Sequence, residues 1–120
     1  MQRNLLIVDD EESILFALRT FFKGAGWAAQ TASTRETALD SIATGTFEAV
    51  VTDLSLTPGG GAEGLEIVGA ARRRLPTARI VVLTAYGTPE REAEALRLGA
   101  SAFLRKPVSL PELARIVEGG

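Results

Sequence analysis

The chain has 120 residues, of which 46% are hydrophobic and 23% charged, and its formal net charge is −2 at pH 7. This length corresponds to one domain, with enough apolar residues for a core that needs no metal or disulfide support. It contains no cysteine or histidine, which excludes disulfides, thiolate catalysis and a histidine general base. The acidic balance argues against direct nucleic-acid binding. Because no apolar stretch approaches the roughly 18 residues that cross a bilayer, we expect a cytoplasmic protein without membrane contact.

Short apolar runs alternate with segments of helical periodicity along the whole chain. The apolar runs predict strands over residues 4–9, 27–32, 47–53, 79–84 and 101–104. Helical periodicity follows each of them, over residues 13–24, 33–45, 65–75, 88–99 and from 109 onward.

Capping residues predict where several of these helices begin and end. Ser33 with Glu36, and Ser109 with Glu112, match the capping box. Residues 38, 39, 42 and 43 are the predicted buried face of the second helix, and Gly45 ends it. Thr88-Pro89 opens the fourth helix. The basic run 72–74 lies late in the third helix, where cations favour the helix dipole.

Five strand–helix units in strict alternation predict an α/β protein with a parallel sheet and helices on both faces. Right-handed crossovers and the chain length favour a flavodoxin-like doubly wound (βα)5 three-layer sandwich with strand order 2-1-3-4-5. Ligands of such sheets bind beyond the carboxyl ends of the strands. The polar residues at those ends are therefore the candidate site.

Four strands end in residues with reactive side chains. Asp9 and Asp10 end the first strand, Asp53 the third and Thr84 the fourth, while Lys106 follows the fifth. Taken singly, each fits an ordinary role as a helix cap, turn residue, strand residue or solvated lysine. Their convergence is not explained by those roles, because neighbouring carboxylates repel one another unless a cation neutralises them. An all-oxygen site of this kind suits Mg²⁺.

Phosphoryl transfer to a carboxylate is the chemistry that such a site supports. A carboxylate can attack phosphorus and form an acyl phosphate, and it is already ionised at neutral pH, so no general base is required. A cation held by Asp10 and Asp53, the Lys106 ammonium group and the Thr84 hydroxyl would then neutralise the three transferred oxygens.

These residues resemble the receiver domain of two-component response regulators, and the resemblance covers essentially the whole chain. It implies that Asp53 accepts a phosphoryl group from a sensor histidine kinase or a histidine phosphotransfer protein. It further implies that Asp9 and Asp10 serve a Mg²⁺ (or Mn²⁺) ion, with Asp10 the more direct ligand, and that the Ser55 backbone carbonyl is another ligand.

The same resemblance assigns a switch. Thr84 and Phe103 would relay phosphorylation to the face formed by helix four, strand five and helix five. That face would act on an unknown output domain or target protein, and two copies of the chain could also pair through it. Phe103 as an ordinary core aromatic is the alternative. Ser55 and Tyr86 match positions that flank the path of the hydrolytic water and would tune the lifetime of the phosphorylated state. Tyr86 as an ordinary loop residue is the alternative. We expect one receiver domain over residues 1–120, without an output domain and without enzymatic turnover of external substrates.

The loop after Asp53 departs from the family pattern. Proline stands five residues after the aspartate, at Pro58, where four is usual, and glycines 59, 60, 61 and 64 lengthen the loop. Since glycine loses the most backbone entropy on ordering, we expect this loop to be mobile and to alter access of the phosphodonor.

Three other functions remain as alternatives. Glycines 59, 61 and 64 formally match a dinucleotide-binding fingerprint, but they do not directly follow a strand, and Thr84 stands where the acidic ribose partner is expected. A phosphohydrolase would carry a second aspartate where Ser55 stands. A receiver-like module that binds partners without phosphorylation is the third alternative.

Overall fold

The computed structural model describes residues 3–57 and 61–119. Pro58, Gly59 and Gly60, which carry part of the unusual loop and of the fingerprint, lie outside the described residues. Ten elements alternate along the chain: β1 (Arg3–Val8), α1 (Glu12–Gly24), β2 (Trp27–Ala32), α2 (Arg35–Thr44), β3 (Ala49–Thr52), α3 (Glu63–Arg74), β4 (Arg79–Thr84), α4 (Pro89–Leu98), β5 (Ala102–Arg105) and α5 (Leu110–Val117).

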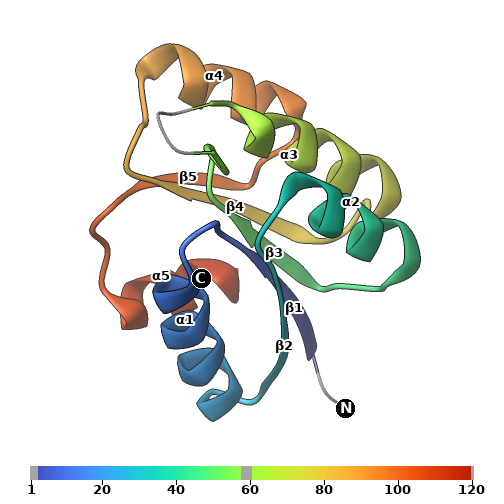
Figure 1. Cartoon of the computed structure of the whole chain (residues 1–120), viewed down its shortest axis with the longest axis vertical. Helices are drawn as coiled ribbons and strands as arrows, with labels where there is room; N and C mark the ends of the chain where they lie inside the picture. The colour runs from blue at the N-terminus through green and yellow to red at the C-terminus, as the bar shows by residue number, and fades with distance from the viewer. Residues whose placement is uncertain (1–2, 58–60, 120) are drawn as a thin grey trace.

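The strands form one parallel sheet in the order β2-β1-β3-β4-β5. Figure 1 shows α1 and α5 on one face of this sheet and α2, α3 and α4 on the other. The doubly wound three-layer sandwich with order 2-1-3-4-5 is therefore confirmed. None of the described helices is long and apolar enough to span a membrane.

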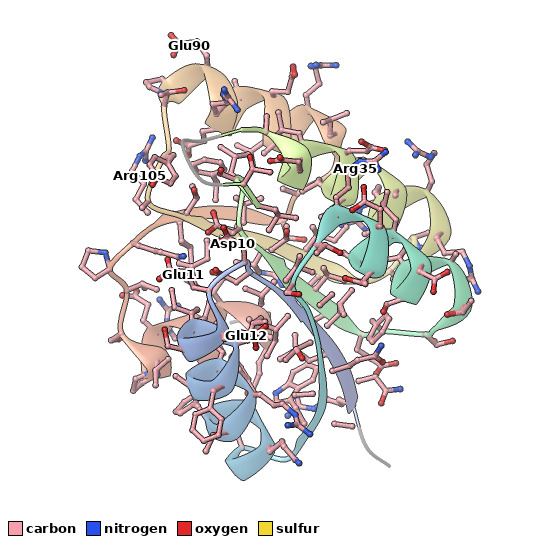
Figure 2. All side chains as sticks on the ribbon, in the orientation of Figure 1. Asp10, Glu11, Glu12, Arg35, Glu90 and Arg105 are labelled. Carbon is pink, nitrogen blue, oxygen red and sulfur yellow. The ribbon has the colours of Figure 1, made fainter. Side chains whose placement is uncertain are left out.

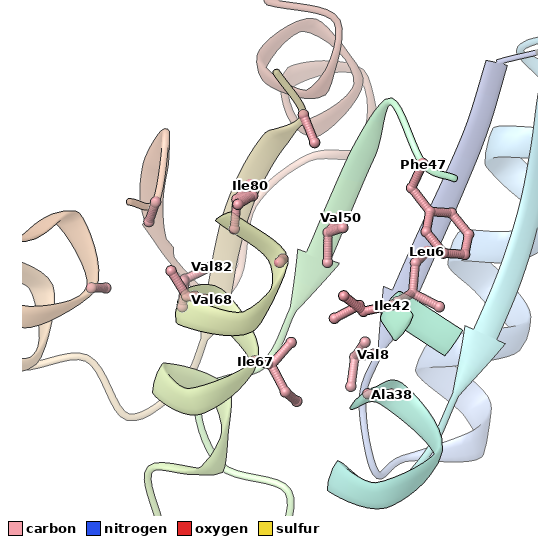
Figure 3. Packing of buried hydrophobic residues seen from close by; sticks show 14 of the residues in the cluster. Leu6, Val8, Ala38, Ile42, Phe47, Val50, Ile67, Val68, Ile80 and Val82 are labelled. Atoms are coloured by element: carbon pink, nitrogen blue, oxygen red, sulfur yellow. The ribbon is translucent and has the colours of Figure 1, made fainter. Parts of the chain in front are cut away.

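Each face of the sheet has its own hydrophobic core. Alternate residues of the central strands point to opposite faces, so Val50 packs under α2 and α3 while Val51 packs under α1 and α5. Figure 3 shows the first core, in which Ile42 and Ile67 meet Val50 between helix and sheet. Burial on both faces explains why these strands read as continuous apolar runs rather than as alternating patterns.

The helix starts confirm some of the predicted caps and correct one. Thr88 and Ser109 cap α4 and α5, and Gly99 ends α4 in the left-handed conformation that glycine favours. The Ser109 hydroxyl accepts a bond from the Glu112 N–H, which is one half of the predicted capping box. The capping box of α2 is instead Thr34 with Thr37, so the prediction of Ser33 with Glu36 is wrong. The two candidate caps, Ser33 and Thr34, are neighbours in the sequence. The Thr34 hydroxyl accepts the bond from the backbone N–H in the first turn of the helix.

The ends of three predicted strands and one buried position also differ from the structure. The first strand covers Arg3–Val8 rather than 4–9, and the fifth covers Ala102–Arg105 rather than 101–104. The third covers Ala49–Thr52 rather than 47–53, although Phe47 is buried. On α2, Ala43 is exposed, whereas Ala38 and Ile42 are buried as predicted. Apolar patterns report burial, and burial extends beyond the residues that pair in the sheet.

Candidate functional site

Three aspartates meet where β1 and β3 end. Val8 and Thr52 are register partners in the sheet, so Asp9 and Asp53 leave adjacent strands side by side, and the Asp53 N–H donates to the Val8 carbonyl at 2.9 Å. One carboxylate oxygen from each of Asp9, Asp10 and Asp53 lies within 4.8 Å of the other two. Figure 2 labels Asp10 at this edge, in the segment that leads to α1. The convergence predicted from the sequence is therefore observed.

Lys106 bridges the two buried members of this cluster. Its Nζ donates to Asp9 Oδ2 at 3.0 Å and to Asp53 Oδ2 at 3.1 Å. Asp9 and Asp53 are only 3% and 5% exposed. The pocket thus holds one ammonium group and three carboxylates, so it has an excess of negative charge.

Burial and charge shift the pKa values of two of these groups. Burial raises the pKa of Asp9, and it outweighs the opposing effects of the Glu11 N–H, which donates to Asp9 Oδ1 at 3.0 Å, and of Lys106. Burial alone would lower the pKa of Lys106, but its bonds and charge interactions with Asp9 and Asp53 raise the pKa overall. Lys106 therefore stays protonated at neutral pH and serves as a permanent cation.

Thr84 ends β4 at the same edge of the sheet, beside β3. Its side chain is fully buried, and its hydroxyl oxygen accepts a bond from the Tyr86 N–H at 3.1 Å. The Lys106 N–H donates to the Thr84 carbonyl at 2.9 Å, which ties the ends of β4 and β5 together. The bond from Tyr86 to the Thr84 hydroxyl uses the backbone of Tyr86, and Tyr86 is 60% exposed.

Phe103 lies on β5 with its ring buried in the core beneath α4. The Arg105 guanidinium group lies 5.6 Å from the ring centroid and also pairs with Glu92 of α4 at 3.1 Å. A Cβ atom added at Gly87 would come within 2.9 Å of the ring and 3.1 Å of the Arg105 side chain. The ring is therefore enclosed by the β4–α4 loop, Arg105 and the core.

Side-chain contacts hold the described ends of the loop after Asp53. The Ser55 hydroxyl donates to the Thr57 carbonyl at 3.0 Å and accepts from the Gly61 N–H at 2.9 Å. The Glu63 carboxylate accepts from the Leu56 N–H at 3.1 Å and from the Thr57 hydroxyl at 2.9 Å. The contacts of Glu63 were not predicted from the sequence, because no helix or strand joins it to Leu56 and Thr57. The predicted mobility of this loop stays a prediction.

The donor set fits a hard divalent cation. Mg²⁺ takes oxygen ligands and usually keeps several waters, with one or two protein carboxylates. Asp10 and Asp53 supply carboxylate oxygens, the Ser55 carbonyl lies in the adjoining loop, and the excess negative charge favours a dication. Asp9 engages Lys106 and the Glu11 amide, so it suits an indirect role.

Comparison with known proteins identifies the family of this chain. The family model for the response regulator receiver domain matches residues 5–118. The chain belongs to the response regulator receiver domain family. This assignment favours the receiver interpretation over the dinucleotide-binding and phosphohydrolase alternatives.

Relatives and solved structures extend the similarity over nearly the whole chain. The photosynthetic apparatus regulatory protein RegA of Rhodobacter capsulatus is 35% identical over 111 residues, covering 92% of this chain and 59% of RegA. This receiver domain therefore spans about three-fifths of the length of that relative. A CheY-like receiver domain protein from Methanospirillum hungatei matches with a TM-score of 0.92 at 26% identity, covering 98% of this chain and 92% of that one.

A response regulator from Burkholderia pseudomallei is also similar, with a TM-score of 0.89 at 27% identity over 98% of this chain and 68% of that one. Its crystal structure contains a phosphorylated aspartic acid, a calcium ion and citrate.

Proposed function

We propose that this receiver domain is a phosphorylation-activated switch in which Asp53 accepts a phosphoryl group with the help of Mg²⁺. The observation that carries the proposal is the convergence of three carboxylates and one lysine at the carboxyl edge of the sheet. The similar regulator from Burkholderia pseudomallei, which holds a phosphorylated aspartate and a divalent cation, supports this assignment.

The chemistry is a direct displacement at phosphorus. A carboxylate oxygen of Asp53 bonds to phosphorus while the bond to the donor breaks, and the electron pair of that bond stays on the leaving nitrogen of a phosphohistidine. Lys106 already lies 3.1 Å from Asp53 and would stabilise the incoming phosphoryl oxygens. The Thr84 hydroxyl would donate to another of these oxygens.

Asp10, Asp53 and the Ser55 carbonyl are the proposed ligands of the cation, with Asp9 acting through Lys106 and the Glu11 amide. When bound, Mg²⁺ (or Mn²⁺) supplies positive charge for the nucleophile and the transferred oxygens. The residues of the chain orient the Asp53 carboxylate and keep Lys106 protonated.

Thr84 and Phe103 form the proposed relay to the α4-β5-α5 face. A bond from the Thr84 hydroxyl to a phosphoryl group would move it away from the Tyr86 amide. The Phe103 ring, on the neighbouring strand β5, would then adjust against α4, and because phenylalanine has no hydroxyl group, the relay would be steric. Ser55 and Tyr86 are proposed to tune the lifetime of the acyl phosphate.

The proposed phosphodonor is a sensor histidine kinase or a histidine phosphotransfer protein. An apolar hollow of about 320 Å³ lies beside Lys106, between α1 and the segment before α5, with Ile14, Leu83 and Pro107 in its lining. It would accept a partner that presents its phosphohistidine to Asp53. An output domain or target protein would read the α4-β5-α5 face, which could also pair two copies.

Incubation with acetyl phosphate and Mg²⁺, followed by intact-protein mass spectrometry, tests the proposal. We expect the wild type to gain one phosphoryl group and Asp53→Asn to gain none. Asp40→Asn, which removes an exposed carboxylate on α2, is the matched control and should react like the wild type. An equal gain by Asp53→Asn would contradict the assignment, and no gain by the wild type would favour a phosphorylation-independent module.

A further inference from the structure

Ser55, whose carbonyl is a proposed cation ligand, shares a peptide plane with Leu56. In a trans peptide the carbonyl of one residue and the N–H of the next are coplanar and point in opposite directions. The Leu56 N–H is directed at Glu63 Oε1 at 3.1 Å. Whatever fixes that N–H therefore also fixes the direction of the Ser55 carbonyl, which points away from Glu63.

Glu63 is well placed to hold this peptide. Its second oxygen, Oε2, accepts a hydrogen bond from the Thr57 hydroxyl at 2.9 Å, so one carboxylate binds two consecutive residues of the loop. The backbone N–H groups of Glu63 itself and of Leu56 lower the pKa of this carboxyl group below its usual range, which keeps it ionised at neutral pH. A Cβ atom at Gly61 would lie 2.6 Å from Glu63 Oε1, so the glycine leaves room for the carboxylate.

The negative charge has a second effect on the same peptide. A hydrogen bond from an N–H group to a carboxylate is stronger than one to a neutral acceptor and polarises the donor group. Polarisation of the Leu56 N–H increases the negative partial charge on the Ser55 carbonyl oxygen, because the amide is delocalised over both. That oxygen becomes a better ligand for a hard cation.

We propose that Glu63 is a positioning residue for the cation site, which orients and polarises the Ser55 carbonyl through the Leu56 amide. This inference rests on the proposed function, since it concerns the same cation. It assigns a role to the first residue of α3.

Calorimetric titration with Mg²⁺ tests the inference on the full chain. We expect Glu63→Gln to weaken Mg²⁺ binding about three- to tenfold, since it removes the charge but keeps an acceptor, and Glu63→Ala to weaken it further. Glu66→Gln is the matched control, because Glu66 lies in the same first turn of α3 but pairs with Arg35 instead of the loop. It should bind Mg²⁺ like the wild type.

Phosphorylation by acetyl phosphate separates positioning from a general defect. If Glu63 acts through cation binding, the rate for Glu63→Gln falls at low Mg²⁺ and returns to the wild-type rate at saturating Mg²⁺. Urea unfolding without Mg²⁺ establishes that the variant is folded. Unchanged Mg²⁺ affinity in folded Glu63→Gln, or a rate defect that persists at saturation, would overturn the inference. A wild type that does not bind Mg²⁺ would instead contradict the proposed function itself.

Discussion

The positive charge of Lys106 does not fully neutralise the three carboxylates of the site without a further cation. Its ammonium group lies 3.0 Å from Asp9 and 3.1 Å from Asp53, both of which are buried. Buried charges are tolerated when they are paired and hydrogen-bonded, and these two are. Among the described residues, none donates a hydrogen bond to the Asp10 side chain. Asp10 therefore adds an uncompensated charge, and it is the carboxylate most available to a divalent ion.

Asp9 makes folding dependent on pH in a direction opposite to most carboxylates. Its pKa is raised by burial, so the folded chain holds this proton more tightly than the unfolded chain does. The ionised group therefore lowers the stability at neutral pH, and this penalty disappears as the pH falls through the raised pKa. Asp9→Asn resembles the protonated group. Without divalent cations, we expect it to be more stable than the wild type at pH 7, with a difference that shrinks as the pH falls.

Urea unfolding at a series of pH values measures this difference. Asp40→Asn on α2 removes an exposed carboxylate and should show no comparable gain at pH 7. A wild type that is more stable than Asp9→Asn at pH 7 would show that the bond to Lys106 outweighs burial, contrary to our account.

The start of α3 and the end of β3 are in close backbone contact. The Gly64 N–H donates to the Leu54 carbonyl at 2.8 Å. A Cβ atom at Gly64 would collide with the Asp53 carbonyl oxygen and lie 2.7 Å from the Leu54 Cα. Because these neighbours are backbone atoms of the site, they cannot yield as a flexible side chain would.

Gly64→Ala should therefore both destabilise the fold and disturb Asp53. We expect a loss of about 2–3 kcal/mol in the free energy of unfolding, together with slower phosphorylation by acetyl phosphate. Gly24→Ala in α1 is the matched control, since nothing lies within 4 Å of its added Cβ atom, and it should leave both quantities nearly unchanged. Equal behaviour of the two variants would show that the contact at Gly64 is not as tight as the structure indicates.

The order and type of all ten elements could be predicted from the sequence, because they follow from apolar runs, helical periodicity and caps. The residues at which the elements begin and end could not be predicted in the same way. Ser33 and Thr34 are both good capping residues one position apart, and the structure has Thr34 as the cap. Phe47 is buried without pairing in β3, so composition alone extends that strand too far.

The candidate site, too, could be predicted from the sequence only in part. Asp9, Asp53 and Lys106 were predictable, because the carboxyl ends of parallel strands must meet at one edge. Their bonding pattern was not, since Lys106 pairs with both aspartates in a geometry that the sheet alone does not determine. The contacts of Glu63 with Leu56 and Thr57 were not predictable, because no helix or strand joins these residues.

At the scale of the whole molecule, β5 contributes side chains to both hydrophobic cores. Phe103 belongs to the core beneath α2, α3 and α4, whereas Leu104, the next residue of β5, packs with the core beneath α1 and α5. A movement of Phe103 would therefore affect α4 first, where the ion pair of Arg105 with Glu92 already joins β5 to the helix. Figure 2 shows Arg105 at the edge of the molecule near the start of α4.

A crystal structure of the protein with Mg²⁺ and beryllium fluoride, which mimics a phosphoryl group, tests the central claim most directly. We predict a cation coordinated by Asp10, Asp53 and the Ser55 carbonyl, with the fluoride group on Asp53 contacted by Lys106 and Thr84. Aspartate side chains that point apart with no ion between them, and Lys106 still bridging Asp9 and Asp53, would contradict the account.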